Sequence, residues 1–187
     1  MTSICQKTRK LNIFLWATTL FDEKHTYIKG FFLSLLIKAD SVNIMKEQKV
    51  EYICTFLASR PRYKLVICQA NPFADIPSLN LGYSLAKDIA KISDVTSISY
   101  EVPGLVDNLI NRATTKIQEV GECVIIENVG ILFEPSLGVI PCDVIAKHAK
   151  NKTVILIWNG EYHKQKLRYN DNLDYTIDLS NINHIAL

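Results

Sequence analysis

The chain has 187 residues, of which 48% are hydrophobic and 21% are charged, and its formal net charge at pH 7 is +2. This composition is that of an ordinary globular protein, and it excludes a disordered or fibrous chain. The nearly balanced charge gives no overall electrostatic preference for nucleic acids or membrane surfaces.

The cysteines predict a reduced, cytoplasmic protein without a metal site. Their number is odd, they lie far apart, and no C-x-x-C pair occurs. Isolated cysteines among apolar neighbours are typically buried free thiols. The four histidines do not cluster with them at zinc-site spacings, so we expect no bound metal. The cysteines are Cys5, Cys54, Cys68, Cys123 and Cys142.

The first 44 residues differ from the rest of the chain. Two apolar runs, Leu11 to Phe21 and Phe31 to Ile37, flank the charged stretch DEKH. Each run is shorter than the roughly 20 residues of a membrane span, so we expect no membrane association. The acidic stretch stands where a signal peptide would have its small-residue cleavage site. We therefore expect residues 1–44 to be an N-terminal extension, or to precede a biological start at Met45, and residues 45–187 to form an α/β domain.

Hydrophobic periodicity then predicts elements in chain order. Helix-spaced apolar residues at Val50, Ile53 and Leu57 indicate a first helix that Pro61 ends. A later helix is predicted from Pro103 to Val120, with Gly121 as the residue that terminates it. The other predicted elements are strands at 63–69, 95–100, 123–129, 153–158 and, at a sheet edge, 175–179, a loop at 71–77, and helices at 84–92 and 141–150.

This alternation predicts a three-layer fold, a parallel sheet with helices on both faces. Ligands of such sheets bind at the carboxyl ends of the strands. There Glu127 is the candidate catalytic carboxylate, since it could hold Mg²⁺ through water or orient an attacking water. Asn128 and Asn159 are candidate nucleotide ligands. The alternative is that Glu127 caps the following turn or pairs with a basic neighbour, and that both asparagines are turn residues.

No G-x-x-x-x-G-K-[ST] phosphate loop occurs in the chain. Its expected place, after the strand at 63–69, is taken by CQANPFADIPSLNLG, which has two prolines that lack an N–H and no lysine. Hydrolysis of ATP by the usual P-loop route is therefore not expected.

The run from His163 to Tyr169 lies in the most basic region of the chain. Lys164, Lys166 and Arg168 could contact phosphates, and Tyr169 could stack on a base. The alternative is a solvated charged face. The sequence thus leaves a nucleic-acid-binding module, with DNA as its partner, as one hypothesis.

The stretch from Val124 to Tyr162 resembles the C-terminal half of BrxF, a family of small P-loop proteins of BREX phage-exclusion systems. The family shows an acidic or Asn-containing strand end, an I-L-F-[DE]-P-x-L segment and a strand that ends W-N-G. Here these motifs resemble Glu127 with Asn128, then Ile131 to Leu137, then Trp158 to Gly160.

The resemblance implies a P-loop NTPase-like fold, ATP and Mg²⁺ as the family's ligands, and other phage-defence proteins as partners. Two departures are visible: only NPFAD remains where the phosphate loop and its helix belong, and Lys150 stands where the family has arginine. We therefore expect a degenerate NTPase, a non-hydrolysing or weakly nucleotide-binding component of a BREX-like complex. The alternatives are an NTPase that uses Glu127, Asn128 and Asn159, and the nucleic-acid-binding module.

Overall fold

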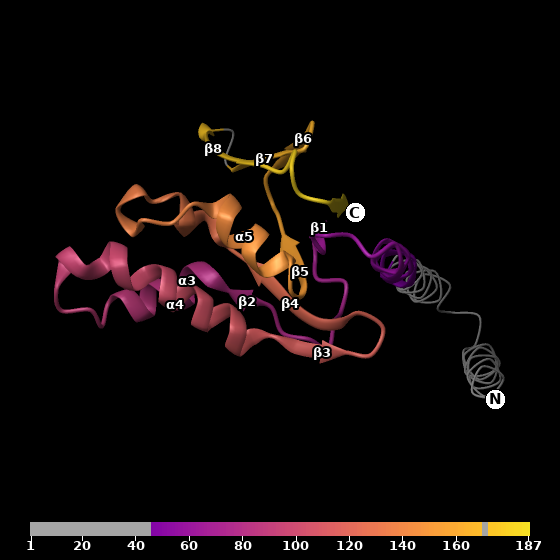
Figure 1. Ribbon diagram of the computed structural model, residues 1–187, viewed down its shortest axis with the longest axis horizontal. Coiled ribbons are helices and arrows are strands. Elements are labelled where there is room, and N and C mark those ends of the chain that lie inside the picture. The colour runs from indigo at the N-terminus through magenta and orange to yellow at the C-terminus, as the bar shows by residue number, and fades with distance from the viewer. Residues whose placement is uncertain (1–45, 170–171) are drawn as a thin grey trace, which may run out of the picture. The chain divides into compact units, whose positions relative to one another are not determined.

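Five parallel strands form the central sheet in the order β2-β4-β5-β1-β9, and β3 extends it by pairing antiparallel with β4 (Figure 1). The computed structural model describes residues 46–169 and 172–187, which form one unit. The predicted extension at 1–44 and the start at Met45 lie outside these residues. The strands are β1 (Leu65–Cys68), β2 (Leu79–Asn80), β3 (Thr115–Ile117), β4 (Gly121–Glu127), β5 (Thr153–Ile157) and β9 (His184–Ala186).

The central strands form where the sequence has continuous apolar runs. Ile155 of β5 pairs with Val66 of β1 on one side and with Ile125 of β4 on the other, and all three side chains are buried. Strands covered on both faces consist of nearly continuous apolar residues, which explains why β1, β4 and β5 could be predicted from the sequence.

Helices cover both faces of the sheet, as predicted. Helices α3 (Leu81–Ile89), α4 (Ile98–Ala113) and α5 (Pro141–Ala149) pack on the face that carries Leu65 and Val124. The helix through residues 46–58 packs on the opposite face, where its residue Ile53 meets strand residues such as Val66. Figure 1 shows α3 and α4 lying along each other beneath α5. The described part of the chain is therefore a three-layer α/β fold with a mostly parallel sheet.

A second, antiparallel sheet of order β6-β7-β8 packs through Leu167 and Ile177 into the same core as α5. Lys164 and Gln165, with φ of 46° and 63°, form the turn between β6 and β7. Such positive φ values are typical of two-residue hairpin turns. The predicted edge strand at 175–179 lies in this sheet. Its strands are β6 (Glu161–His163), β7 (Lys166–Tyr169) and β8 (Asn172–Asp178).

The predicted strand at 95–100 is wrong. Residues 95–97 form a 3-10 turn and α4 begins at Ile98. Ile98, Val102 and Val106 recur every four residues and all pack into the core, so the helical period prevails over the apparent alternation. The turn is capped by Asp94, whose side chain accepts from the N–H of Thr96 at 2.9 Å.

The predicted helix from Pro103 to Val120 is also wrong at both ends. Pro103 lies inside α4, and the helix ends at Ala113. Residues Thr115–Ile117 instead form β3, and Gly121, with φ of +82°, serves the turn into β4. Ile117 is buried on the opposite face of the sheet from α4, which a continued helix would not allow.

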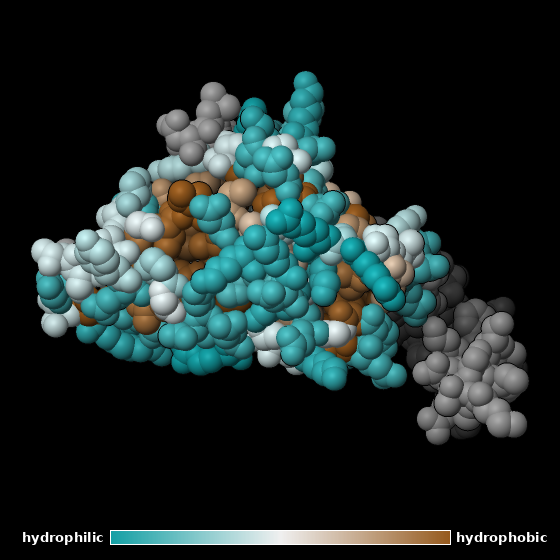
Figure 2. Space-filling model, in the orientation of Figure 1, coloured by the Kyte–Doolittle hydropathy of each residue, from teal (hydrophilic) through white to brown (hydrophobic). Residues whose placement is uncertain are grey.

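The viewed surface is mostly hydrophilic, with apolar areas separated from one another (Figure 2). Within residues 46–169 and 172–187, no helix combines the length and the apolar character that a membrane span needs.

Candidate strand-end site

Glu127 is the last residue of β4 and is half-buried. It pairs in register with Asn80 of β2. In the described part of the chain, no group makes a hydrogen bond or ion pair with its carboxylate. Glu127 is therefore a half-buried carboxylate without a hydrogen-bond or ion-pair partner among the described residues.

Asn128, which follows Glu127, makes hydrogen bonds that hold the start of α3. Its left-handed backbone, with φ of 55°, turns its carbonyl oxygen to accept from the N–H of Gly82 at 3.0 Å. Its side-chain amide donates to Asn80 Oδ1 at 3.1 Å, and the same oxygen accepts from the N–H of Tyr83. Asn128 thus supports the N-terminal cap of α3. This corresponds to the turn-residue alternative, and its role as a nucleotide ligand remains a prediction.

Asn159 follows β5 and is exposed. Pairing of Ile126 with Leu156 places the ends of β4 and β5 at the same edge of the sheet, as expected for parallel strands. The preceding Trp158 is buried, and its backbone N–H donates to the carbonyl of Cys68 at 2.8 Å. The fold thus brings the Glu127 and Asn159 strand ends to one edge.

The loop at 69–78 occupies the place where a phosphate loop would follow β1. The Asn71 amide donates to the carbonyl of Ile76 at 2.7 Å, and its Oδ1 accepts from the N–H of Phe73 at 2.9 Å. Phe73 and Ile76 pack onto the sheet face covered by the helix at 46–58. The loop is closed on itself and directed onto the sheet, so it does not form the open series of N–H groups that a phosphate needs. The Asn-Pro dipeptide signalled such a side-chain turn.

The basic region does not form a free cationic surface. Lys166 Nζ lies 3.6 Å from Asp178 Oδ2, and Arg168 Nη1 lies 3.9 Å from Glu161 Oε2. Lys164, at the hairpin turn, is exposed. This mixed charge fits the solvated-face alternative better than a phosphate-binding stripe, and the role of these residues in nucleic-acid binding remains a prediction.

Tyr169 belongs to an aromatic cluster. Its ring centroid lies 6.1 Å from that of Phe133 and 5.8 Å from that of Trp158. A Cβ at Gly130 would lie 2.8 Å from the Tyr169 ring, so the ring packs directly on the backbone there. These contacts leave less of its face for a stacked base than the sequence suggested.

Sequence reasoning missed a polar cluster between α4 and α5. Asp107 of α4 forms an ion pair with Lys147 and lies 3.0 Å from Nε2 of His148. Nearby, the buried Lys152 donates to Asn111 Oδ1 and Thr114 Oγ1, both at 2.8 Å. The bonded partners lie 38 to 41 positions apart in the chain, so no local motif indicates the cluster.

Burial and charge shift the pKa values in this cluster. Desolvation lowers the pKa of His148 and outweighs the attraction of Asp107, while Lys152 and Lys147 lower it further. Partial burial by itself would raise the pKa of Asp107, but hydrogen bonds and charges, first those of Lys147, bring it below its ordinary value. At neutral pH the pair is therefore a neutral imidazole whose Nε2–H donates to a carboxylate.

The described cysteines are free thiols. Desolvation raises the pKa of Cys68 to about 11 and that of Cys123 to about 12, so neither is a reactive thiolate at neutral pH. The predicted burial is confirmed for these two, whereas Cys54 and Cys142 are half-buried. Cys5 lies outside the described residues.

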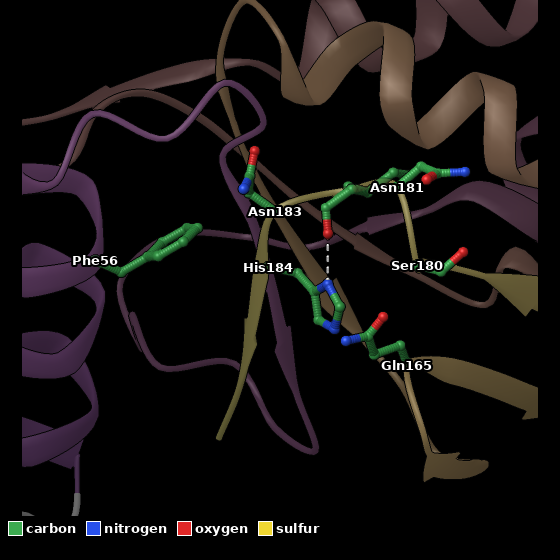
Figure 3. Close-up of a pocket in the computed structure, with 7 residues that line it drawn as sticks. Phe56, Gln165, Ser180, Asn181, Asn183 and His184 are labelled. Carbon is green, nitrogen blue, oxygen red and sulfur yellow. Dashed lines mark hydrogen bonds between the residues drawn. The ribbon is translucent and has the colours of Figure 1, made fainter.

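Among the described residues, two surface hollows are lined by residues other than those at the Glu127 and Asn159 strand ends. One, of about 450 Å³, lies by the connection between α3 and α4, and the other, of about 370 Å³, lies before β9 (Figure 3). Among residues 46–169 and 172–187, no group of three or more His, Cys, Asp and Glu side chains could hold a metal.

No protein-family model, no curated protein and no solved structure matches the chain.

Proposed function

We propose that the chain is a P-loop-derived α/β protein that acts in the cytoplasm as a non-hydrolysing component of a BREX-like phage-defence assembly. The observation that carries the proposal is the loop at 69–78, in which Asn71 closes the backbone and Phe73 and Ile76 pack onto the sheet. A loop packed in this way leaves no cradle for a triphosphate. The fold would then act by contacting partner proteins through its surfaces, without hydrolysing a nucleotide.

The strand order supports the P-loop part of the proposal. Strand β5 lies between β1 and β4, so the Asn159 strand end lies between the ends of β1 and of the Glu127 strand. Ligands of parallel α/β sheets bind at the carboxyl ends of the strands. Glu127 and Asn159, at two such strand ends, are the candidates for the acidic and the sensing residue of a P-loop ancestor.

Nucleotide binding is a second candidate function, because the carboxylate of Glu127 has no partner among the described residues. A partner protein that supplies a phosphate loop would complete such a site. In that case Glu127→Gln would abolish nucleotide-dependent association, since the carboxylate would be needed to hold Mg²⁺ through water.

The test measures both copurification with partner proteins and protection against phage. The tagged full chain, expressed with its neighbouring genes, is expected to copurify with a large ATPase and a DNA methyltransferase, and its deletion is expected to remove protection against phage. Glu127→Gln is expected to retain both properties. Absence of association together with unchanged phage plating after deletion would contradict the proposal.

A further inference from the structure

Two segments that enter neighbouring strands bring cations together at the amino ends of β1 and β5. Residues 60–64 lead into β1, and residues 150–152 lead from α5 into β5. The segments adjoin each other, since the N–H of Lys64 donates to the carbonyl of Ala149 at 2.8 Å. Four of their basic side chains are exposed or half-buried, and we call them the basic edge. They are Arg60, Arg62, Lys64 and Lys150.

The ring of Tyr63 gathers two of these cations. Arg62 Cζ lies 5.4 Å from the centroid of the ring, and Lys150 Nζ lies 5.5 Å from it. The ring attracts cations through its quadrupole, and it is itself packed against the hydrophobic core. Cations from both segments are thus held around one anchored side chain, which lowers the cost of ordering them when an anion binds.

The basic edge has no carboxylate partner. Within residues 46–169 and 172–187, none of its four cations forms an ion pair, whereas Lys166 and Arg168 of the β6-β7 hairpin both lie near carboxylates. The helix at 46–58 and α5 both end at this edge. Because a helix C-terminus carries only about half an elementary negative charge, the two helix ends offset a minor part of the four positive charges. Most of the charge is therefore available to an outside anion.

Arg60 has an unfavourable backbone conformation for an arginine. Its φ is 53°, and its N–H donates to the carbonyl of Leu57 at 3.0 Å, so it closes the end of the helix at 46–58. Glycine is the usual residue in this left-handed position, because a Cβ makes the conformation costly. The chain has an arginine there instead, and the exposed guanidinium is what the position gains for that cost.

The surroundings of the basic edge favour a nucleic-acid backbone over an acidic protein. None of the large exposed hydrophobic side chains in the described part of the chain comes from residues 60–64 or 150–152. A protein partner would usually need such side chains for the apolar centre of its interface, whereas phosphates are bound by Arg and Lys alone. Tyr63 is half-buried and already carries two cations, so its ring is not free to stack on an unpaired base.

We infer that the basic edge binds the phosphate backbone of a nucleic-acid duplex without reading its bases. The cations supply charge for several phosphates, and a duplex asks for no stacking surface because its bases are already stacked on one another. The site is separate from the hairpin at 163–169. The inference does not rest on the phage-defence proposal.

Fluorescence anisotropy of labelled DNA duplexes, titrated with the full chain, tests the inference. Two duplexes of unrelated sequence are expected to bind equally, with a dissociation constant on the order of 10 µM that weakens as salt is added. Arg60→Gly is the decisive variant, because glycine suits the left-handed backbone: Tm should stay the same or rise while affinity falls about threefold or more. Lys91→Ala is the matched control. It also removes one positive charge, but Lys91 is already paired with Asp88, so the affinity should not change.

A combined variant and two further ligands complete the test. Replacing Arg60 by Gly, Arg62 by Ala and Lys150 by Met together is expected to reduce the slope of log affinity against log salt by about three. The inference is overturned if no salt-dependent binding occurs, or if Arg60→Gly binds like the native chain. It is also overturned if polyglutamate binds as tightly as the duplex, if single-stranded DNA binds more than about tenfold more tightly, or if Lys164→Ala abolishes binding while the combined variant retains it.

Discussion

His148 Nε2 lies 3.0 Å from Asp107 Oδ1, and this contact joins α5 to α4 through an imidazole whose side chain is only 7% exposed. The burial of the ring, and then the cations of Lys152 and Lys147, oppose protonation of His148, whereas Asp107 favours it. The balance lowers the pKa of His148, so the folded protein holds it in the neutral form at neutral pH.

Stability is therefore expected to fall as the solution is acidified from neutral pH. In the unfolded chain His148 takes up a proton near its ordinary pKa of about 6.5, whereas the folded chain resists protonation to a lower pH. The stabilisation is fully present above about pH 6.5 and is lost as the pH falls toward the lower folded-state pKa. Thermal unfolding of His148→Gln should show a smaller decrease in Tm between pH 7.5 and 5.5 than the native chain. Equal decreases would contradict the assignment. The lowered pKa of Asp107 acts at lower pH, since its stabilisation is fully present above the ordinary pKa of about 3.9 and is lost as the pH falls from there through the folded-state pKa.

Lys152→Met should raise the pKa of His148. The ammonium of Lys152 is buried, donates to the neutral oxygens of Asn111 and Thr114, and lowers the pKa of the nearby imidazole. Methionine has a similar shape without the charge. A titration followed by the His148 ring resonances should show the increase, whereas the exposed Lys150→Met control should not, because solvent screens its charge. An unchanged or lower pKa of His148 in Lys152→Met would contradict the proposed effect of the Lys152 charge on His148.

Gly160→Ala should destabilise the fold. A Cβ at Gly160 would lie 2.0 Å from the carbonyl oxygen of Arg168, so the β6-β7 hairpin would have to move. A cost of at least about 2 kcal/mol in the free energy of unfolding is expected. Gly104→Ala in α4 has no atom within 4 Å and is expected to stabilise by about 0.5–1 kcal/mol. Denaturant unfolding of both variants checks this, and equal effects would refute the close contact.

Tyr169→Ala should act on stability more than on DNA affinity. The ring packs on Phe133 and Trp158, and its removal is expected to cost about 2 kcal/mol, below the range for fully buried aromatic residues because it is half-buried. Tyr100, which is 87% exposed, is the control, and Tyr100→Ala should change stability by no more than about 0.5 kcal/mol. If Tyr169→Leu left Tm unchanged and reduced DNA binding, base stacking would be the role of Tyr169.

The sequence was most informative where strands are buried on both faces. The runs at β1, β4 and β5 could be predicted because their residues are continuously apolar and end at polar positions. By contrast, β2, β3 and β9 have two or three residues each, too few to show a period, and tertiary pairing defines them. The error at 95–100 has a similar cause, since six residues fit either period until the core contacts of Ile98 and Val102 are known.

The sequence predicted only those parts of the candidate site that depend on residues close together in the chain. Strand ends indicated Glu127 and Asn159, and the register of β4 with β5 brings their strand ends to one edge. The bond between Asn128 and Asn80 joins residues 48 positions apart, and the one between His148 and Asp107 joins residues 41 positions apart. Such pairings depend on how the helices pack, which spacing along the chain does not report.

Calorimetric titration of the full chain with ATP and GTP, with and without Mg²⁺, tests the central claim most directly. We predict no binding tighter than about 1 mM and no phosphate release, because the loop at 69–78 is packed onto the sheet and has no phosphate cradle. Micromolar, Mg²⁺-dependent binding that is lost in Glu127→Ala would contradict this prediction, since it would mean that the strand-end carboxylate still serves a nucleotide.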